Sequence, residues 1–311
     1  MAMDALTPAT DAPQPVFVLA LPKTYTSVFG GMLGQHPGIM GTPELNMFVG
    51  ETVHDWAYQP ANDVLFNVFR DGLLRTLSQL QFGAQTVQTV QAAEQWLVDR
   101  QNWPIRDVFE HLRALSAPKI LLDQSPIYTA KPAHILRILE AYPNAKFIHL
   151  VRNPTGWVKS MLGWQRIGPV LLDMYAKEEQ GLNRNPDPVE IWHATHEGIA
   201  GLLSQLPEDQ WIRVQGETVI TDTVPAMRRV VEFLGLSMGP AETEEMMHPE
   251  NSVFAGWGPP GARGGNNPDF LSDPRLKLKT VEQLPGLLKI QTDAMNVPPE
   301  ALTFARELGY E

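Results

Sequence analysis

The chain has 311 residues, and 24 Lys and Arg against 35 Asp and Glu give it a formal net charge of −11. It contains no cysteine, which excludes disulfides, thiolate metal sites and cysteine nucleophiles. Hydrophobic residues make up 43% of the chain, a share that favours a large core over disorder. An acidic chain is a poor general binder of nucleic acid or anionic membranes, but it can still hold a small basic pocket for an anionic ligand.

Residues 1–15 are polar and rich in Ala and Pro, without the basic start and apolar core of a signal peptide. We predict a flexible leader there, followed by a single domain over 16–311. No apolar run approaches the roughly 20 residues that span a bilayer. We therefore expect a cytoplasmic protein without a membrane span.

The main part of the chain alternates between two kinds of segment. Continuous apolar runs predict strands buried on both faces at 16–21, 119–123, 146–151 and 211–214. Helical spacing follows them at 28–33, 133–141, 155–162 and 224–234, the last with Thr223 as the expected cap and Gly235 as the stop. This alternation predicts an α/β fold, a central parallel sheet flanked by helices.

Three regions depart from the alternation. Residues 50–115 look mostly helical and are expected to form a helical cap region. Residues 168–188 are polar and contain Asn-Arg-Asn-Pro-Asp-Pro, which favours a mobile insertion that could act as a lid. Residues 249–274 are rich in Gly and Pro and predict a long loop, which in a compact domain is usually functional or disordered.

The first segment whose residues could bind a ligand or take part in a reaction is Leu-Pro-Lys-Thr-Tyr-Thr-Ser-Val-Phe at 21–29. A buried strand there delivers Lys23, several hydroxyls and a run of backbone N–H groups to a helix N-terminus, which is an anion site by geometry. An ordinary turn in which Thr24 or Thr26 caps the helix is an equal alternative. The G-x-x-x-x-G-K-[ST] pattern occurs nowhere in the chain, which disfavours a Mg-dependent nucleoside triphosphatase.

The second such segment covers residues 146–162. Arg152 stands where a strand ends, and Ser160 lies on the helix that follows. Ligands bind at the carboxyl ends of parallel strands, where an Arg can hold a phosphate through two N–H bonds and a Ser can add a third. A surface ion pair for Arg152 and a solvated position for Ser160 are the alternative.

These two segments resemble the nucleotide-binding signatures of PAPS-dependent sulfotransferases. The blocks 36–48, 121–128 and 214–236 resemble other family segments, so the similarity runs in pieces from about 16 to 275. The resemblance implies a P-loop-like sulfotransferase fold, with PAPS as donor and PAP as product. It implies contacts with the 5′-phosphosulfate from Lys23, Thr24, Tyr25, Thr26 and Ser27, and contacts with the 3′-phosphate from Arg152 and Ser160.

The chain also departs from the family pattern. Tyr25 stands where the family usually has Gly, Gln124 where Lys is common, and Gly216 where a Tyr commonly meets the adenine. Residues 261–270 mirror the C-terminal glycine-rich phosphate loop, and this implies Arg263, with Gly264 beside it, as a further 3′-phosphate ligand. A solvated loop charge is the alternative for Arg263.

Sulfuryl transfer should resemble phosphoryl transfer, which proceeds in line and depends on positioning and charge. Lys23 can neutralise the leaving phosphate oxygen, and no metal is expected. The acceptor hydroxyl needs a general base. The resemblance favours Glu44, which could instead orient a neighbouring cation or backbone N–H; His196, one helical turn after His193, is the second candidate.

We therefore predict a sulfotransferase that acts on a hydroxyl, or less expectedly an amine, of a small-molecule or carrier-bound acceptor. Residues 44–48 also resemble sulfotransferases of bacterial secondary metabolism. Two alternatives stay open: an ATP-dependent, kinase-like phosphoryl transferase, and a degenerate sulfotransferase-like protein that binds a nucleotide or a partner without turnover. Binding of PAP without metal, compared with binding of ATP with Mg, separates them.

Overall fold

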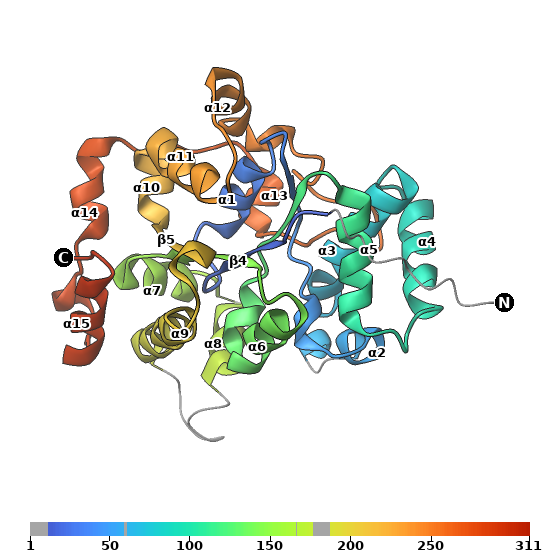
Figure 1. The fold of residues 1–311 in the computed structure, drawn as a ribbon. Helices are drawn as coiled ribbons and strands as arrows, with labels where there is room; N and C mark the ends of the chain where they lie inside the picture. Colours follow the sequence, from blue (N-terminus) through green and yellow to red (C-terminus); the bar gives the residue numbers. More distant parts are fainter. Residues whose placement is uncertain (1–11, 59–60, 166, 177–186) are drawn as a thin grey trace.

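The computed structural model describes residues 12–58, 61–165, 167–176 and 187–311. Its centre is a sheet of five strands: β1 (Val16–Leu19), β2 (Ile39–Gly41), β3 (Ile120–Asp123), β4 (Lys146–Val151) and β5 (Trp211–Gln215). Their order across the sheet is β2-β3-β1-β4-β5, and every pairing is parallel. The predicted α/β fold with a central parallel sheet is confirmed (Figure 1).

Successive residues of β1 point to opposite faces of the sheet and enter different hydrophobic clusters. Phe17 and Leu19 join a cluster with helices α3 (Ala61–Phe82), α4 (Val87–Val98), α5 (Ile105–Ser116) and α6 (Pro132–Ala141). Val16 and Val18 join a cluster with α1 (Thr26–Leu33), α11 (Thr223–Phe233) and α12 (Pro240–Met246). Because both faces are covered, the strands need apolar side chains on both sides.

A third cluster lies beyond the carboxyl end of β4. It joins Val151 to α7 (Pro154–Leu162), α8 (Gly168–Ala176), α9 (Pro188–Leu203) and α15 (Pro299–Glu307). The first half of the predicted insertion at 168–188 is therefore the packed helix α8, whereas 177–186 fall outside the described residues. The helical prediction for 50–115 is confirmed by α2 (Val53–Ala57), α3, α4 and α5.

Two short elements escaped prediction from sequence. Strand β2 has only three residues, and α10 (Gly216–Thr221) follows β5 without a loop. The prediction that Thr223 caps a helix was wrong, because Asp222 is the N-cap and Thr223 donates its hydroxyl to the Val219 carbonyl at 2.8 Å. Gly235 ends this region with a φ of 78°, as expected of a helix stop.

The predicted loop at 249–274 holds only η4 (Pro249–Asn251) and α13 (Pro268–Ser272). Arg75 of α3 anchors it by donating to the carbonyls of Gly264 at 2.9 Å and Phe254 at 3.2 Å. The remaining elements are η1 (Met47–Val49), η2 (Pro126–Ala130), η3 (Glu208–Gln210), η5 (Val281–Gln283), α14 (Leu284–Leu288) and η6 (Thr292–Ala294). Among the described helices, none is long and apolar enough to cross a membrane.

Candidate active site

The carboxyl ends of all five strands meet at one edge of the sheet, and each is followed by a residue that shapes the site. Lys23 follows β1, Glu44 follows β2 and Gln124 follows β3; Arg152 follows β4 and Gly216 follows β5. Ligands of open α/β sheets bind at such an edge. Two cavities lie there, one rich in cations and one largely apolar.

The loop after β1 has an unusual backbone. Lys23 and Tyr25 have positive φ angles of 64° and 62°, which are uncommon for residues other than glycine and cost about 1–3 kcal/mol each. Tyr25 is the N-cap of α1 and makes no side-chain cap bond. The alternative that Thr24 or Thr26 caps this helix was therefore wrong, since Thr26 is already the first helical residue. The first turn of α1 thus faces the cation-rich cavity without a capping side chain.

The cation-rich cavity contains five basic and two acidic side chains. Its lining residues are Lys23, Tyr25, Thr26, Ser27, Val28, Arg152, Ser160, Ile220, Asn267, Asp269, Phe270, Asp273, Arg275, Lys277 and Lys279. Six of the predicted cofactor-binding residues are therefore gathered around one cavity. The excess of positive charge and the hydroxyls suit an anionic ligand.

Arg152 joins the exit of β4 to the loop after β1. Its Nη1 donates to the Lys23 carbonyl at 2.5 Å, and its guanidinium carbon lies 4.5 Å from the centre of the Tyr25 ring. Its Nε is buried without a hydrogen-bond partner. A buried unpaired donor is costly, and a bound anion that reached this nitrogen would remove that cost.

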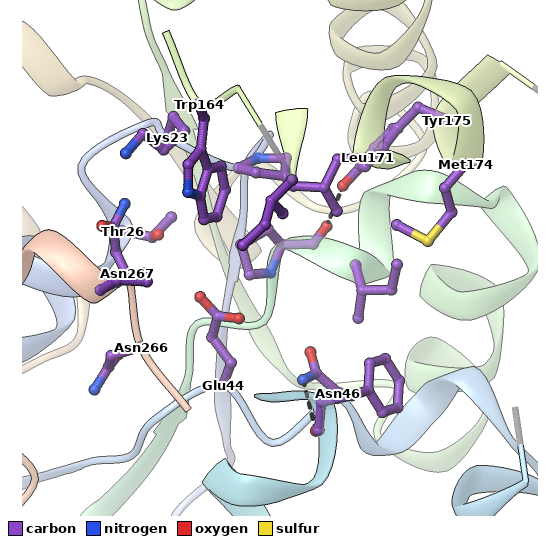
Figure 2. A pocket seen from close by; sticks show the side chains of 16 residues that line it. Lys23, Thr26, Glu44, Asn46, Trp164, Leu171, Met174, Tyr175, Asn266 and Asn267 are labelled. Atoms are coloured by element: carbon purple, nitrogen blue, oxygen red, sulfur yellow. Dashed lines mark hydrogen bonds between the residues drawn. The ribbon is translucent and has the colours of Figure 1, made fainter. Parts of the chain in front are cut away.

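The apolar cavity lies on the other side of Lys23. Figure 2 shows the Glu44 carboxyl pointing into it, between Thr26 and Asn267 on one side and Leu171 and Met174 on the other. Its full lining is Pro22, Lys23, Thr26, Glu44, Asn46, Phe69, Pro126, Ile127, Trp164, Ile167, Leu171, Met174, Tyr175, Asn266, Asn267 and Pro268. The two cavities share Lys23, Thr26 and Asn267, so they adjoin one another at these residues.

Lys23 is held at the junction of the two cavities. Its Nζ donates to Asp269 at 2.9 Å and lies 4.7 Å from the centre of the Trp164 ring. The Lys23 side chain is 11% exposed, whereas that of Asp269 is 84% exposed. A mostly buried cation with an exposed partner can exchange that partner for a bound anion at modest cost.

The backbone of Glu44 is fixed by close packing. Its N–H donates to the Gly265 carbonyl at 2.7 Å, and a Cβ at Gly72 of α3 would lie only 1.9 Å from the Glu44 carbonyl oxygen. Burial, with a smaller contribution from the charge of Asp123, raises the pKa of Glu44 from 4.5 to about 8. A carboxyl with that pKa is far more basic than an ordinary one.

Asp123 is itself tightly bound at the end of β3. It accepts hydrogen bonds from the hydroxyls of Ser125 at 2.5 Å and Tyr128 at 2.6 Å. Gln124, beside it, donates to the Asn266 side chain at 2.8 Å. Gln124 therefore orients the segment that brings Asn266 and Asn267 into the site.

Four predicted site residues lie outside both cavities. His196 is fully buried, shares a hydrogen bond with His149 at 2.9 Å, and burial, with a smaller contribution from Arg213, lowers its pKa to about 3. Thr24 is buried with an unpartnered hydroxyl. The structure thus gives His196 no access to an acceptor at either cavity.

The other two belong to the loop before α13. Arg263 is exposed, with its guanidinium carbon 5.8 Å from the centre of the Trp257 ring. Gly264 donates its N–H to Asp71 at 2.6 Å, and its carbonyl accepts from Arg75 at 2.9 Å. Gly264 therefore anchors the loop to α3.

Three cations that follow this loop were not predicted from the sequence. Arg275, Lys277 and Lys279 all line the cation-rich cavity. Asp273 accepts from Arg275 at 2.7 and 3.1 Å and pairs with Lys277 at 3.2 Å. The alternation Arg-Leu-Lys-Leu-Lys was the available signal, because every second residue of an extended chain points to the same side.

A family model described as the Sulfotransferase family matches residues 15–240. The chain belongs to the sulfotransferase family. The sulfotransferase domain from the Synechococcus PCC 7002 olefin synthase has a similar structure, with a TM-score of 0.73, 22% identity and 98% coverage of both chains. The sulfotransferase domain from the curacin biosynthetic pathway gives a TM-score of 0.75 at 20% identity, over 97% of this chain and 99% of that one.

These two structural similarities establish the fold of this sulfotransferase-family chain. Both extend over residues beyond the family match, so the C-terminal segment with Arg275 and Lys277 is part of the same fold. No curated protein sequence matches the chain.

Proposed function

We propose that this chain transfers the sulfuryl group of PAPS to a hydroxyl on an apolar acceptor, either a small molecule or a carrier-bound chain. The observation that carries the proposal is the meeting of a cation-rich cavity and an apolar cavity at Lys23. A transferase needs such a junction, because the reacting atoms of the donor and the acceptor must be held close together. We also propose a cytoplasmic location.

The donor set of the cation-rich cavity fits PAPS. That molecule has anionic groups at its 5′ and 3′ positions, and the cavity offers five cations, the hydroxyls of Thr26, Ser27 and Ser160, and the unpartnered Arg152 Nε. We assign Lys23, Thr26 and Ser27 to the 5′-phosphosulfate, and Arg152 and Ser160 to the 3′-phosphate. The cations at 275, 277 and 279 take the place expected for Arg263.

PAPS supplies the sulfuryl group and, in PAP, a leaving group whose phosphate oxygen gains negative charge. The Lys23 ammonium stabilises that charge from the junction of the two cavities. Trp164 and Asp269 hold the ammonium in place. The first turn of α1 adds backbone N–H groups and the positive end of a helix dipole.

Glu44 acts as the general base in this proposal. Its carboxyl lies in the apolar cavity, and its pKa of about 8 makes it strong enough to take the proton of an acceptor hydroxyl as the oxygen attacks sulfur. The apolar walls limit water, which would otherwise compete as an acceptor. Asn46 beside it is fixed, since its side-chain amide donates to the Phe69 carbonyl at 3.0 Å.

The walls of the apolar cavity indicate the acceptor class. Lys23 and Glu44 are its only charged lining residues among those that the structure describes. An uncharged apolar chain with a hydroxyl fits such walls, whereas a charged group would lie there without a partner. The resemblance of residues 44–48 to sulfotransferases of bacterial secondary metabolism, some of which act on carrier-bound acyl chains, supports an acyl-type acceptor, free or carrier-bound.

The experiment is calorimetric titration of PAP into metal-free protein, with ATP and Mg as the control, followed by transfer assays with PAPS and a series of hydroxylated acyl acceptors. We expect micromolar binding of PAP, no response to ATP, and turnover with an uncharged acceptor. Binding of ATP with Mg instead of PAP would favour a kinase-like enzyme. Binding of PAP without transfer to any acceptor would favour a degenerate scaffold.

A further inference from the structure

Three residues that follow three different strands contact one another at the rim of the cation-rich cavity. Tyr25 follows β1, Arg152 follows β4 and Gly216 follows β5. The Arg152 guanidinium carbon lies 4.5 Å from the centre of the Tyr25 ring. A Cβ at Gly216 would lie 2.5 Å from Cδ2 and 3.2 Å from Cε2 of the same ring. The ring therefore fills a space that exists only because residue 216 is glycine.

The contact between these residues requires a strained backbone conformation at Tyr25. Tyr25 has a φ of 62°, a conformation that glycine would adopt without strain. A tyrosine that persists there must contribute contacts that offset the strain. The contacts that the structure shows for its ring are those with Arg152 and Gly216.

The Tyr25 ring and the Lys23 carbonyl together orient Arg152. Its Nη1 is bound to the Lys23 carbonyl, and its Nε has no partner. Among the described residues, no carboxylate forms an ion pair with it. The buried Glu217 carboxyl is occupied by the Asn153 N–H at 2.9 Å and the Tyr310 hydroxyl at 3.1 Å. The charge of Glu217 interacts with Arg152, but the direct contacts that hold the guanidinium are the Lys23 carbonyl and the Tyr25 ring face.

We propose that Tyr25, seated against Gly216, is the positioning residue that fixes the Arg152 guanidinium for a 3′-phosphate. Tyr25 and Gly216 then act as one unit that gives the site its preference for a 3′-phosphorylated nucleotide. The identity of the ligand rests on the proposed function, whereas the interlock of the three side chains does not.

The test compares PAP with AMP, which differs from it only by lacking the 3′-phosphate. Tyr25→Gly removes the ring but tolerates the positive φ, and Tyr25→Phe keeps the ring. We expect Tyr25→Gly to weaken PAP binding about three- to thirtyfold, the range of a cation–π contact. Binding of AMP should change by less than about twofold, and Tyr25→Phe should bind PAP like the parent chain.

A double-mutant cycle tests whether Tyr25 and Gly216 are one unit. Gly216→Ala should weaken PAP binding in the parent chain, because the new methyl group displaces the ring. In the Tyr25→Gly background the same change should cost less than about twofold. Independent effects, equal losses for PAP and AMP, or a loss in Tyr25→Phe as large as in Tyr25→Gly would each overturn the proposal.

A second readout needs no nucleotide. Arg152 in the parent chain should react slowly with phenylglyoxal, followed by peptide mass spectrometry, and several times faster in Tyr25→Gly. Equal rates in two folded proteins would overturn the interlock. Failure of the parent chain to bind PAP, with the rate difference present, would overturn the proposed donor and leave the positioning of Arg152 standing.

Discussion

The two cavities share Lys23 but handle charge in opposite ways. The cation-rich cavity spreads its positive charge over five side chains, some of them well exposed, as Arg275 is at 73% and Lys277 at 69%. The apolar cavity holds one carboxyl, Glu44, whose pKa burial raises to about 8. We therefore expect many side chains to share ligand binding in the first cavity, whereas in the proposed mechanism the rate depends on Glu44 in the second. Substitutions should separate accordingly into effects on Kd and effects on turnover.

The largest expected effect concerns Glu44. Glu44→Gln keeps the shape of the side chain but removes the base, so transfer should fall about 10²–10⁴-fold while PAP binding stays unchanged. Steady-state transfer and calorimetry measure the two quantities. Glu51→Gln, at an exposed carboxyl outside both cavities, is the matched control. Turnover near that of the parent chain would remove Glu44 from the role of base.

The next largest effect concerns Arg152, whose substitution should change Kd in the cation-rich cavity. Arg152→Ala removes a charged hydrogen-bond donor of the cation-rich cavity and should weaken PAP binding by roughly 1.5–3 kcal/mol, about 10- to 150-fold. Arg106→Ala, at an exposed arginine away from the site, controls for lost net charge. An unchanged Kd in calorimetry would show that Arg152 does not contact the ligand.

The pH profile tests the apolar cavity without a mutation. Because burial raises the pKa of Glu44 to about 8, the base is mostly protonated at neutral pH. Transfer should therefore rise about tenfold per pH unit up to that pKa and then level off. A profile that is already flat between pH 6 and 8 would contradict the assignment.

The free energy of unfolding should also depend on pH through the raised pKa of Glu44. A carboxyl whose pKa rises on folding contributes stability that is fully present below its unfolded pKa of about 4.5 and is lost as the pH passes through about 8. Glu44→Gln removes this dependence. The variant should therefore melt at a higher temperature than the parent chain at pH 9 and at a similar one at pH 4. Equal melting temperatures at both pH values would indicate an ordinary pKa.

The strands, and several site residues that follow them, could be predicted from the sequence. Apolar runs predicted four of the five strands, because a strand covered on both faces must be apolar throughout. Strand β2 has three residues, too few for a pattern. Lys23 and Arg152 could be placed from the sequence because they closely follow strands, and Ser160 because it lies on the helix after β4. The parallel sheet then brings all three to one cavity.

The features of the site that could not be predicted from the sequence depend on contacts between distant segments. A helical pattern could not distinguish a buried His196 from one that faces a substrate, since both lie on the apolar side of a helix. Tyr25 and Gly216 were each noted as departures, but their mutual contact is a three-dimensional fact. The alternation of basic residues at 275, 277 and 279 is visible in the sequence, but it does not say which cavity these residues line.

The smallest expected effect compares Arg263, the loop arginine predicted from the sequence, with Arg275. Arg275 lines the cation-rich cavity, whereas Arg263 lies against Trp257 outside it. Arg275→Ala should weaken PAP binding about two- to fivefold, the scale of an exposed ion pair, and Arg263→Ala should leave it unchanged.

Asp273→Asn should act in the opposite direction, because Asp273 neutralises Arg275 and Lys277, and its loss should tighten PAP binding by a similar factor. The effects of Arg275→Ala and Asp273→Asn should both fade at high salt, since exposed charges are screened. A stronger effect of Arg263→Ala than of Arg275→Ala would instead favour the glycine-rich loop as the site of the 3′-phosphate.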